Sequence, residues 1–168
     1  MTSPGRLEGH ADAVERLAAA LVARGWRMAT AESCTGGLIA ATCTERAGSS
    51  DWLDCGIVTY SNAAKVALLG VDAALIAAHG AVSEPVARAM LAGALQRAAG
   101  ADLAVSVTGI AGPGGAVPGK PVGTVWLAWG RRGDAALCER LQLDGDRAAV
   151  RDATVAAALK RLTALAEG

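Results

Sequence analysis

Residues 27–46 constrain the fold of this chain more than any other stretch. A short β-prone run, 27–31, leads through Glu-Ser-Cys-Thr-Gly-Gly into a helix-prone run, 38–46. This pattern predicts a strand that turns sharply into a helix. Ser33 would then lie beside the free N–H groups at the start of that helix. Such donors, with the positive end of the helix dipole, can stabilise an oxyanion or a phosphate.

The turn carries two adjacent candidate nucleophiles, Ser33 and Cys34. Gly36 and Gly37 lack a Cβ atom, so a ligand can approach the backbone closely at these positions. A purely structural turn is the alternative, because Ser and Thr are common helix caps and Gly-Gly is common in turns.

The composition indicates one folded domain. The chain has 168 residues, of which 52% are hydrophobic, which is enough for a core and excludes disorder. The formal net charge is zero, so the chain lacks the electrostatic signature of a nucleic-acid-binding protein. No run is apolar for long enough to span a membrane, and residues 1–9 do not resemble a signal peptide. We therefore expect a cytoplasmic protein with a flexible N-terminal arm at 1–9 and one domain at 10–168.

The order of predicted elements indicates an α/β fold. Separated early strands and a later hairpin favour a single-domain mixed β-sheet covered by helices. The predicted helices are 11–24, 38–46, 61–69, 72–78, 84–99 and 148–165, and the predicted strands are 27–31, 56–60, 102–108, 122–129 and 136–143.

The sequence predicts neither a metal site nor a cofactor. No Cys-x-x-Cys pair occurs, and His10 and His79 form no ligand spacing with the cysteines. In a reducing compartment we expect free, mostly buried thiols. The four cysteines are Cys34, Cys43, Cys55 and Cys138.

Residues 59–65, Thr-Tyr-Ser-Asn-Ala-Ala-Lys, contain a candidate general base. With Asn62 as helix cap, Lys65 would occupy the third helical position, where the dipole opposes a cation. That field, together with partial burial, would lower the pKa of the lysine and allow it to activate a serine. Tyr60 could relay a proton or orient Lys65. The alternative is a solvated helix lysine beside a tyrosine at the rim.

Two further stretches are candidate anion sites. Residues 108–115 follow a strand, which is where α/β proteins bind ligands, and their backbone could cradle an anion. Arg147 stands at the start of the last helix and could grip a phosphate with two hydrogen bonds. The alternatives are a structural crossover for the loop and, for the arginine, a surface pair with Asp144 or Asp146.

Two familiar motifs are excluded. Residues 114–120 nearly match a P-loop, but Pro121 replaces the Ser or Thr and a strand follows in place of a helix. The turn at Ser33 is not a Gly-x-Ser-x-Gly elbow, because Ala31 and Thr35 occupy the glycine positions.

Taken together, these stretches resemble the CinA C-terminal domain family. The resemblance covers nearly the whole chain, in order, without the molybdopterin-binding-like domain that precedes it in longer members. The motifs that carry it are Ala-Glu-Ser-Cys-Thr-Gly-Gly (31–37), Thr-Tyr-Ser-Asn-x-x-Lys (59–65), Gly-Ala-Val-Ser (80–83), Thr-Gly-Ile-Ala-Gly-Pro (108–113), Lys-Pro-Val-Gly-Thr-Val (120–125) and Gly-Asp-Arg (145–147).

The resemblance implies hydrolysis of nicotinamide mononucleotide to nicotinate mononucleotide and ammonia. It implies Ser33 as the nucleophile, Lys65 as its base and Tyr60 as an assisting group. The expected partner is this small molecule, not nucleic acid or membrane, and we expect a homo-oligomer. The expected substrate-binding residues are Cys34, Thr35, Gly36, Gly37, Thr108, Gly109 and Arg147.

Two other functions remain open at this point. The family name derives from competence and DNA damage, so the domain could be a non-enzymatic interaction module, although the neutral charge argues against direct DNA contact. The chain could also hydrolyse the amide of a different nucleotide.

Overall fold

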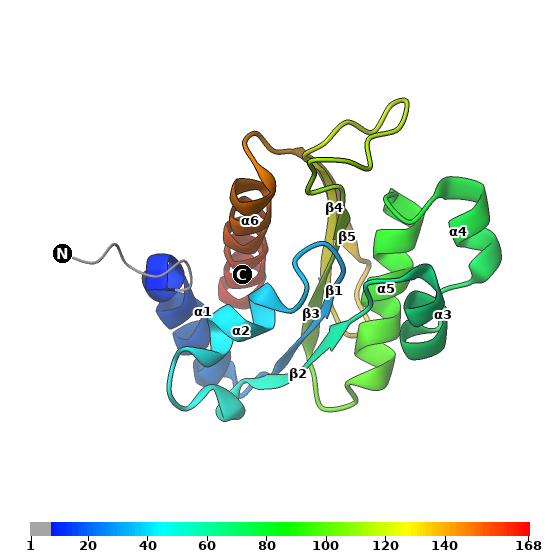
Figure 1. Cartoon of the computed structure of the whole chain (residues 1–168). Coiled ribbons are helices and arrows are strands. Elements are labelled where there is room, and N and C mark those ends of the chain that lie inside the picture. The colour runs from blue at the N-terminus through cyan, green and yellow to red at the C-terminus, as the bar shows by residue number, and fades with distance from the viewer. Residues whose placement is uncertain (1–7) are drawn as a thin grey trace.

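The computed structural model describes residues 8–168, which form a single five-stranded sheet flanked by helices (Figure 1). The strand order is β2-β1-β3-β4-β5, with β1, β2 and β3 parallel and β4 and β5 antiparallel to their neighbours. The elements are η1 (Glu8–His10), α1 (Ala11–Arg24), β1 (Met28–Glu32), α2 (Leu38–Thr44), η2 (Ser49–Asp51), β2 (Leu53–Val58), α3 (Asn62–Leu69), α4 (Ala73–His79), α5 (Glu84–Arg97), β3 (Leu103–Gly109), β4 (Thr124–Arg131), β5 (Leu137–Gln142) and α6 (Arg147–Glu167).

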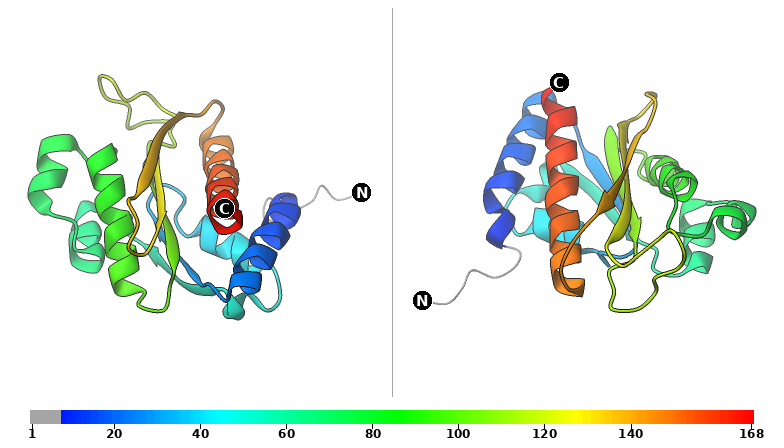
Figure 2. Two further views of the ribbon diagram at one scale, coloured as in Figure 1. Left: turned by 180° about the vertical axis from the view of Figure 1, so that it is seen from behind. Right: turned by 90° about the horizontal axis from the view of Figure 1, so that it is seen from above.

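Helices cover both faces of the sheet. On one face α1, α2 and α6 pack over large side chains of the strands, among them Met28, Leu103 and Leu127 (Figures 1 and 2). On the other face α3, α4 and α5 pack over small ones, including Ala29 and Ala104. Because side chains alternate along a strand, one buried strand supplies both cores. The predicted mixed sheet covered by helices is therefore confirmed.

All six predicted helices and all five predicted strands are present, most of them with shifted ends. The bounds of α1 are as predicted, and β4 and β5 form the expected hairpin. Strand β2 begins at Leu53, three residues earlier than predicted, and α6 begins at Arg147. Of the expected N-terminal arm, residues 1–7 lie outside the described residues, while Glu8–His10 forms a short 3₁₀ helix.

The parallel strands determine where a site can form. β1, β2 and β3 end at the same edge of the sheet, because they run in the same direction. The β1–α2 turn, the β2–α3 connection and the long 110–123 loop all leave from that edge. The first turn of α6 lies at the same end of the molecule (Figure 1). Across residues 8–168, no helix has both the length and the apolar character needed to cross a membrane.

Candidate active site

Lys65 and Ser33 are in direct contact although they are far apart in the sequence. Lys65 Nζ lies 2.9 Å from Ser33 Oγ and donates a 2.7 Å hydrogen bond to the carbonyl oxygen of Thr59. The lysine is only 1% exposed. Within residues 8–168, no ion pair involves it. Burial therefore lowers the pKa of Lys65, while the nearby Cys34 acts in the opposite direction.

The capping prediction for the lysine helix was wrong by one residue. Ser61, not Asn62, caps α3, and its side chain accepts a 3.0 Å hydrogen bond from the Ala64 N–H. Lys65 consequently occupies the fourth helical position, where its own N–H already bonds the Ser61 carbonyl. The lysine pKa is lowered mainly by burial of the ammonium group.

The expected anion-binding helix start is already occupied by the side chain of Glu32. This carboxylate is fully buried at the end of β1, directly before Ser33. Its hydrogen-bond donors are the hydroxyls of Thr30 and Thr35 and the backbone N–H groups of Gly37, Ile39 and Ala40. The α2 N-terminus is therefore unavailable to an oxyanion, contrary to the expectation from the sequence. An acidic residue inside an otherwise uncharged strand was the signal that sequence reasoning missed.

The structure places three of the expected substrate-binding residues away from the site cavity. Thr35 and Gly37 bind Glu32, as described above. Gly36 and Gly37 have φ angles of 62° and 94°, a region that favours glycine, so they shape the turn.

The remaining expected site residues line one cavity of about 220 Å³. They come from four separate segments: the β1–α2 turn, the β2–α3 connection, the end of β3 and the start of α6. The expected residues that line it are Ser33, Cys34, Tyr60, Lys65, Thr108, Gly109 and Arg147, and they are joined there by Asn62, Ala81, Val82 and Ala111.

The two candidate nucleophiles differ in chemical state. Burial raises the pKa of the Cys34 thiol to about 11, so it is protonated at neutral pH and a poor nucleophile. Ser33 is 8% exposed, lines the cavity and contacts the lysine amine. The geometry therefore favours Ser33.

Tyr60 is hydrogen-bonded to Arg147, and in the described part of the chain no hydrogen bond joins it to Lys65. Its hydroxyl accepts a 2.7 Å hydrogen bond from Arg147 Nη2, and the ring is largely exposed at the cavity mouth. Arg147 Nη1 also donates to the carbonyl of Gly112 at 2.9 Å. Asp146 instead caps α6 through the N–H of Ala149, so Arg147 is not held in the surface pair considered above.

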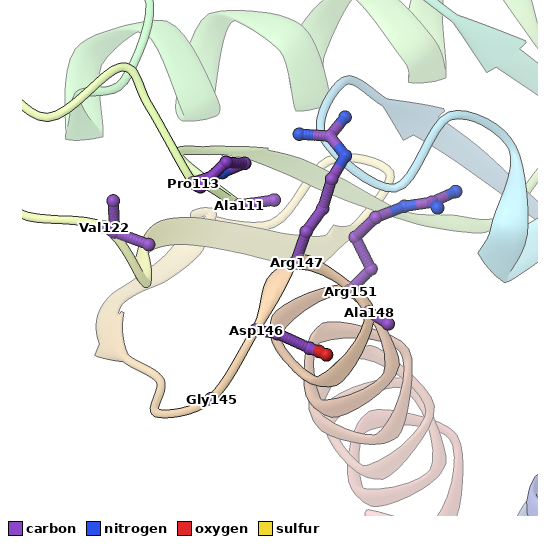
Figure 3. A pocket seen from close by; sticks show the side chains of 8 residues that line it. All are labelled: Ala111, Pro113, Val122, Gly145, Asp146, Arg147, Ala148 and Arg151. Carbon is purple, nitrogen blue, oxygen red and sulfur yellow. The ribbon is translucent and has the colours of Figure 1, made fainter.

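A second cavity of about 460 Å³ adjoins the first, and both are lined by Ala111 and Arg147. Arg147 and Arg151 extend from the first turns of α6 toward the same side (Figure 3). Arg151 Nη2 donates to the carbonyl of Thr35 in the nucleophile turn, at 2.9 Å. In the described part of the chain, no ion pair involves either arginine.

Residues 8–168 contain no group of three or more His, Cys, Asp or Glu side chains arranged to hold a metal ion. Cys34 and Cys43 are buried and Cys55 and Cys138 are half-buried, and all four are free thiols.

Comparison with known proteins identifies the family. The CinA C-terminal domain matches residues 10–166. The chain belongs to the CinA C-terminal domain family. This confirms the family that the sequence motifs indicated. A CinA superfamily protein from Klebsiella pneumoniae has the same fold, with a TM-score of 0.88, 43% identity, and coverage of 92% of this chain and 96% of that one. The competence/damage inducible protein CihA from Agrobacterium tumefaciens gives a TM-score of 0.90 at 45% identity, with 98% of each chain covered.

Relatives of this CinA C-terminal domain have two kinds of name. A "CinA-like protein" of Mycolicibacterium vanbaalenii is 57% identical over 82% of this chain, which spans only 32% of that protein's length. The chain thus spans about a third of such longer relatives. A "Nicotinamide-nucleotide amidohydrolase PncC" of Pseudomonas putida is 56% identical, with 83% of this chain and 86% of that protein covered. The protein of the same name from Enterobacter agglomerans is also 56% identical, over 80% and 82%.

Proposed function

We propose that this chain hydrolyses the carboxamide of nicotinamide mononucleotide to nicotinate mononucleotide and ammonia, a step that recycles pyridine nucleotides. The names of the two PncC relatives support this reaction. The observation that carries the proposal is the 2.9 Å contact between Lys65 Nζ and Ser33 Oγ, made by a buried lysine. A serine hydroxyl within hydrogen-bond reach of an amine with a lowered pKa is a nucleophile paired with its base.

In the first half of the reaction, neutral Lys65 accepts the Ser33 proton while Oγ attacks the carboxamide carbon. The carbonyl oxygen gains negative charge in the tetrahedral intermediate. The protonated lysine then donates its proton to the amide nitrogen, the C–N bond breaks and ammonia leaves. The product of this half-reaction is a nicotinoyl ester on Ser33.

In the second half, water attacks the ester carbon and Lys65 accepts a proton from it. The ester bond to Ser33 breaks, the lysine returns the proton to Oγ, and nicotinate mononucleotide leaves. The lysine is thus neutral at the start of each half-reaction. Its carbonyl partner, Thr59, can accept a hydrogen bond from either the neutral amine or the ammonium, so it holds Nζ in place throughout.

The two adjoining cavities suit a molecule with an amide at one end and a phosphate at the other. The smaller cavity contains Ser33 and Lys65, and Arg147 stands where it meets the larger one. A guanidinium has five N–H donors, and two of the Arg147 nitrogens already bond Gly112 and Tyr60. The remaining donors can bind a phosphate oxygen, while Thr108 and Gly109 line the amide end.

Released ammonia from a panel of amides tests the proposal directly. The purified chain is incubated with nicotinamide mononucleotide, nicotinamide riboside, nicotinamide and the dinucleotide, and the acid product is identified by chromatography. We expect ammonia and nicotinate mononucleotide from the mononucleotide, and no turnover by Ser33→Ala. Turnover of another amide only would identify a different amidohydrolase. If no amide is hydrolysed faster than by Ser33→Ala, the chain is not an amidohydrolase of this class, and the non-enzymatic module becomes the better hypothesis.

We also propose that the chain forms a homo-oligomer. Sedimentation of the purified chain measures this, and a monomeric mass at assay concentration would contradict it.

A further inference from the structure

The carboxylate of Glu32 is the most densely hydrogen-bonded side chain near the candidate nucleophile. Oε2 accepts from the Thr35 hydroxyl at 2.6 Å and from the N–H groups of Gly37 and Ile39 at 3.1 and 3.0 Å. Oε1 accepts from the Ala40 N–H at 2.9 Å and the Thr30 hydroxyl at 3.1 Å. The side chain is fully buried, so these donors are not available to another acceptor.

The backbone N–H groups around Ser33 differ in their hydrogen-bond partners. Those at the start of α2 bond Glu32. The N–H of Ser33 bonds the carbonyl of Val107, and the N–H of Gly36 bonds Ser33 itself. The N–H groups of Cys34 and Thr35 face the sulfur of Cys34, a weak acceptor, and within the described residues they bond neither Glu32 nor a backbone carbonyl.

Of these two residues, Cys34 lines the cavity that contains Ser33 and Lys65, and Thr35 does not. In α/β-hydrolases, the N–H of the residue that follows the serine nucleophile is one of the oxyanion donors. Because Glu32 does not bond it and its residue lines the cavity, the Cys34 N–H is the candidate oxyanion donor of this turn.

The backbone of Glu32 also connects the turn to the lysine. Its carbonyl accepts the N–H of Thr59 at 2.8 Å, and the carbonyl of Thr59 accepts Lys65 Nζ at 2.7 Å. Glu32 therefore contacts the segments that position both Ser33 and Lys65. Its side chain bonds the turn that carries Ser33, and its carbonyl bonds Thr59, whose own carbonyl orients the Lys65 amine.

We propose that Glu32 is a positioning residue of this site: its carboxylate holds the Ser33 turn in its reactive shape and leaves the Cys34 N–H as the oxyanion donor of this turn. This inference rests on the proposed amidohydrolase function. Glu32 does not touch the substrate, so it acts on the rate through the position of groups that do.

Glu32→Gln tests the inference with a side chain of nearly the same shape. With its oxygen toward Thr35, Gly37 and Ile39, the Gln turns an NH₂ group toward the N–H of Ala40, so a donor faces a donor. We expect kcat for nicotinamide mononucleotide to fall by at least about 10-fold while KM changes less than about 2-fold, because misplaced reacting groups affect the transition state more than ground-state binding.

A ligand that forms a tetrahedral adduct separates positioning from simple stability. Nicotinaldehyde mononucleotide, in which an aldehyde replaces the carboxamide, can add Ser33 Oγ and place an oxyanion where the intermediate would. We expect Glu32→Gln to weaken its inhibition at least about 10-fold, with the inhibition constant of nicotinate mononucleotide unchanged. Equal inhibition of wild type and variant by the aldehyde, or an unchanged kcat, would overturn the proposal.

Two more variants complete the experiment. Cys43→Ala destabilises the same helix by removing a buried side chain that makes none of the Glu32 hydrogen bonds, and it should keep the wild-type kcat. Thr35→Val removes only the 2.6 Å donor, and it decides the question if Glu32→Gln does not fold. We expect a lower kcat from it, whereas a raised KM alone would show that Thr35 contacts substrate and that the inference is wrong. Wild-type turnover with normal Glu32→Gln activity refutes only this inference, while absence of wild-type turnover refutes the proposed function itself.

Discussion

Lys65→Met separates the stability of this protein from its activity. Lysine and methionine have similar length, and the side chain at this position is 1% exposed and has no ion-pair partner within residues 8–168. Without its base, the Ser33 hydroxyl loses its proton acceptor. We expect kcat/KM to fall by at least about 10²-fold, the lower end of what a general base contributes. Lys65→Arg keeps the charge but supplies no base, and it should be equally inactive.

The same variant has a calculable effect on stability. Burial lowers the pKa of Lys65 in the folded protein below its ordinary value of 10.5. Between the folded pKa and 10.5 the unfolded chain therefore binds more protons, and the free energy of unfolding rises with pH. One proton gives a slope of at most about 1.4 kcal/mol per pH unit. The rise in the free energy of unfolding begins at the folded pKa of Lys65 and is complete above pH 10.5. Lys65→Met has no titrating group at this position, so its free energy of unfolding should not show this rise.

Urea unfolding of both proteins at a series of pH values measures the difference. The comparison is best made below pH 9.0, the ordinary cysteine value, because the buried thiols act in the opposite direction. The pKa of Cys43 is raised to about 12 in the folded protein, so the stability it contributes is lost as pH rises above 9.0. The wild-type stability gain should begin near the apparent pKa on the rising limb of kcat/KM. Parallel curves for wild type and Lys65→Met would show that the buried lysine stays charged and cannot be the base.

Three further predictions concern the same site. Ser33→Ala should abolish hydrolysis. Cys34→Ala should retain most activity, because the thiol, with a pKa of about 11, is protonated. If steady-state rates show that the cysteine variant is inactive and the serine variant active, Cys34 is the nucleophile. Arg147→Ala removes a charge-assisted hydrogen bond worth about 1.5–3 kcal/mol, so KM for the mononucleotide should rise at least about 10-fold while the riboside is little affected; equal losses on both substrates would contradict a phosphate role. Dialysis against a chelator should leave the rate unchanged, and activity restored by a divalent ion would show that a metal is required.

Local sequence patterns were sufficient for the elements and for the outline of the site. Helical periodicity and a terminal glycine define α1, and a short connection defines the β4–β5 hairpin. The turn at Ser33 and the helix at Lys65 were visible because each lies where a strand passes directly into a helix. The motif order identified the family, which the comparison confirms.

The contacts between those segments depend on the tertiary structure. Ser33 and Lys65 are 32 positions apart, and Tyr60 and Arg147 are 87 apart. Each pair meets because the parallel strands end at one edge of the sheet and α6 begins beside it. A local pattern contains no information about which of several polar groups at that edge will touch, so the expected role of Tyr60 beside Lys65 did not include its hydrogen bond to Arg147.

The sequence by itself determined which residues could do the chemistry, and the tertiary structure decided their chemical state. It is burial in the assembled core, far more than position on a helix, that lowers the pKa of Lys65 and raises that of Cys34. It is also the fold that brings the Glu32 carboxylate to the start of α2 and so fills the donors that the sequence left open to a substrate. Solvation and hydrogen bonding depend on every neighbouring segment at once, so they exist only in the folded chain.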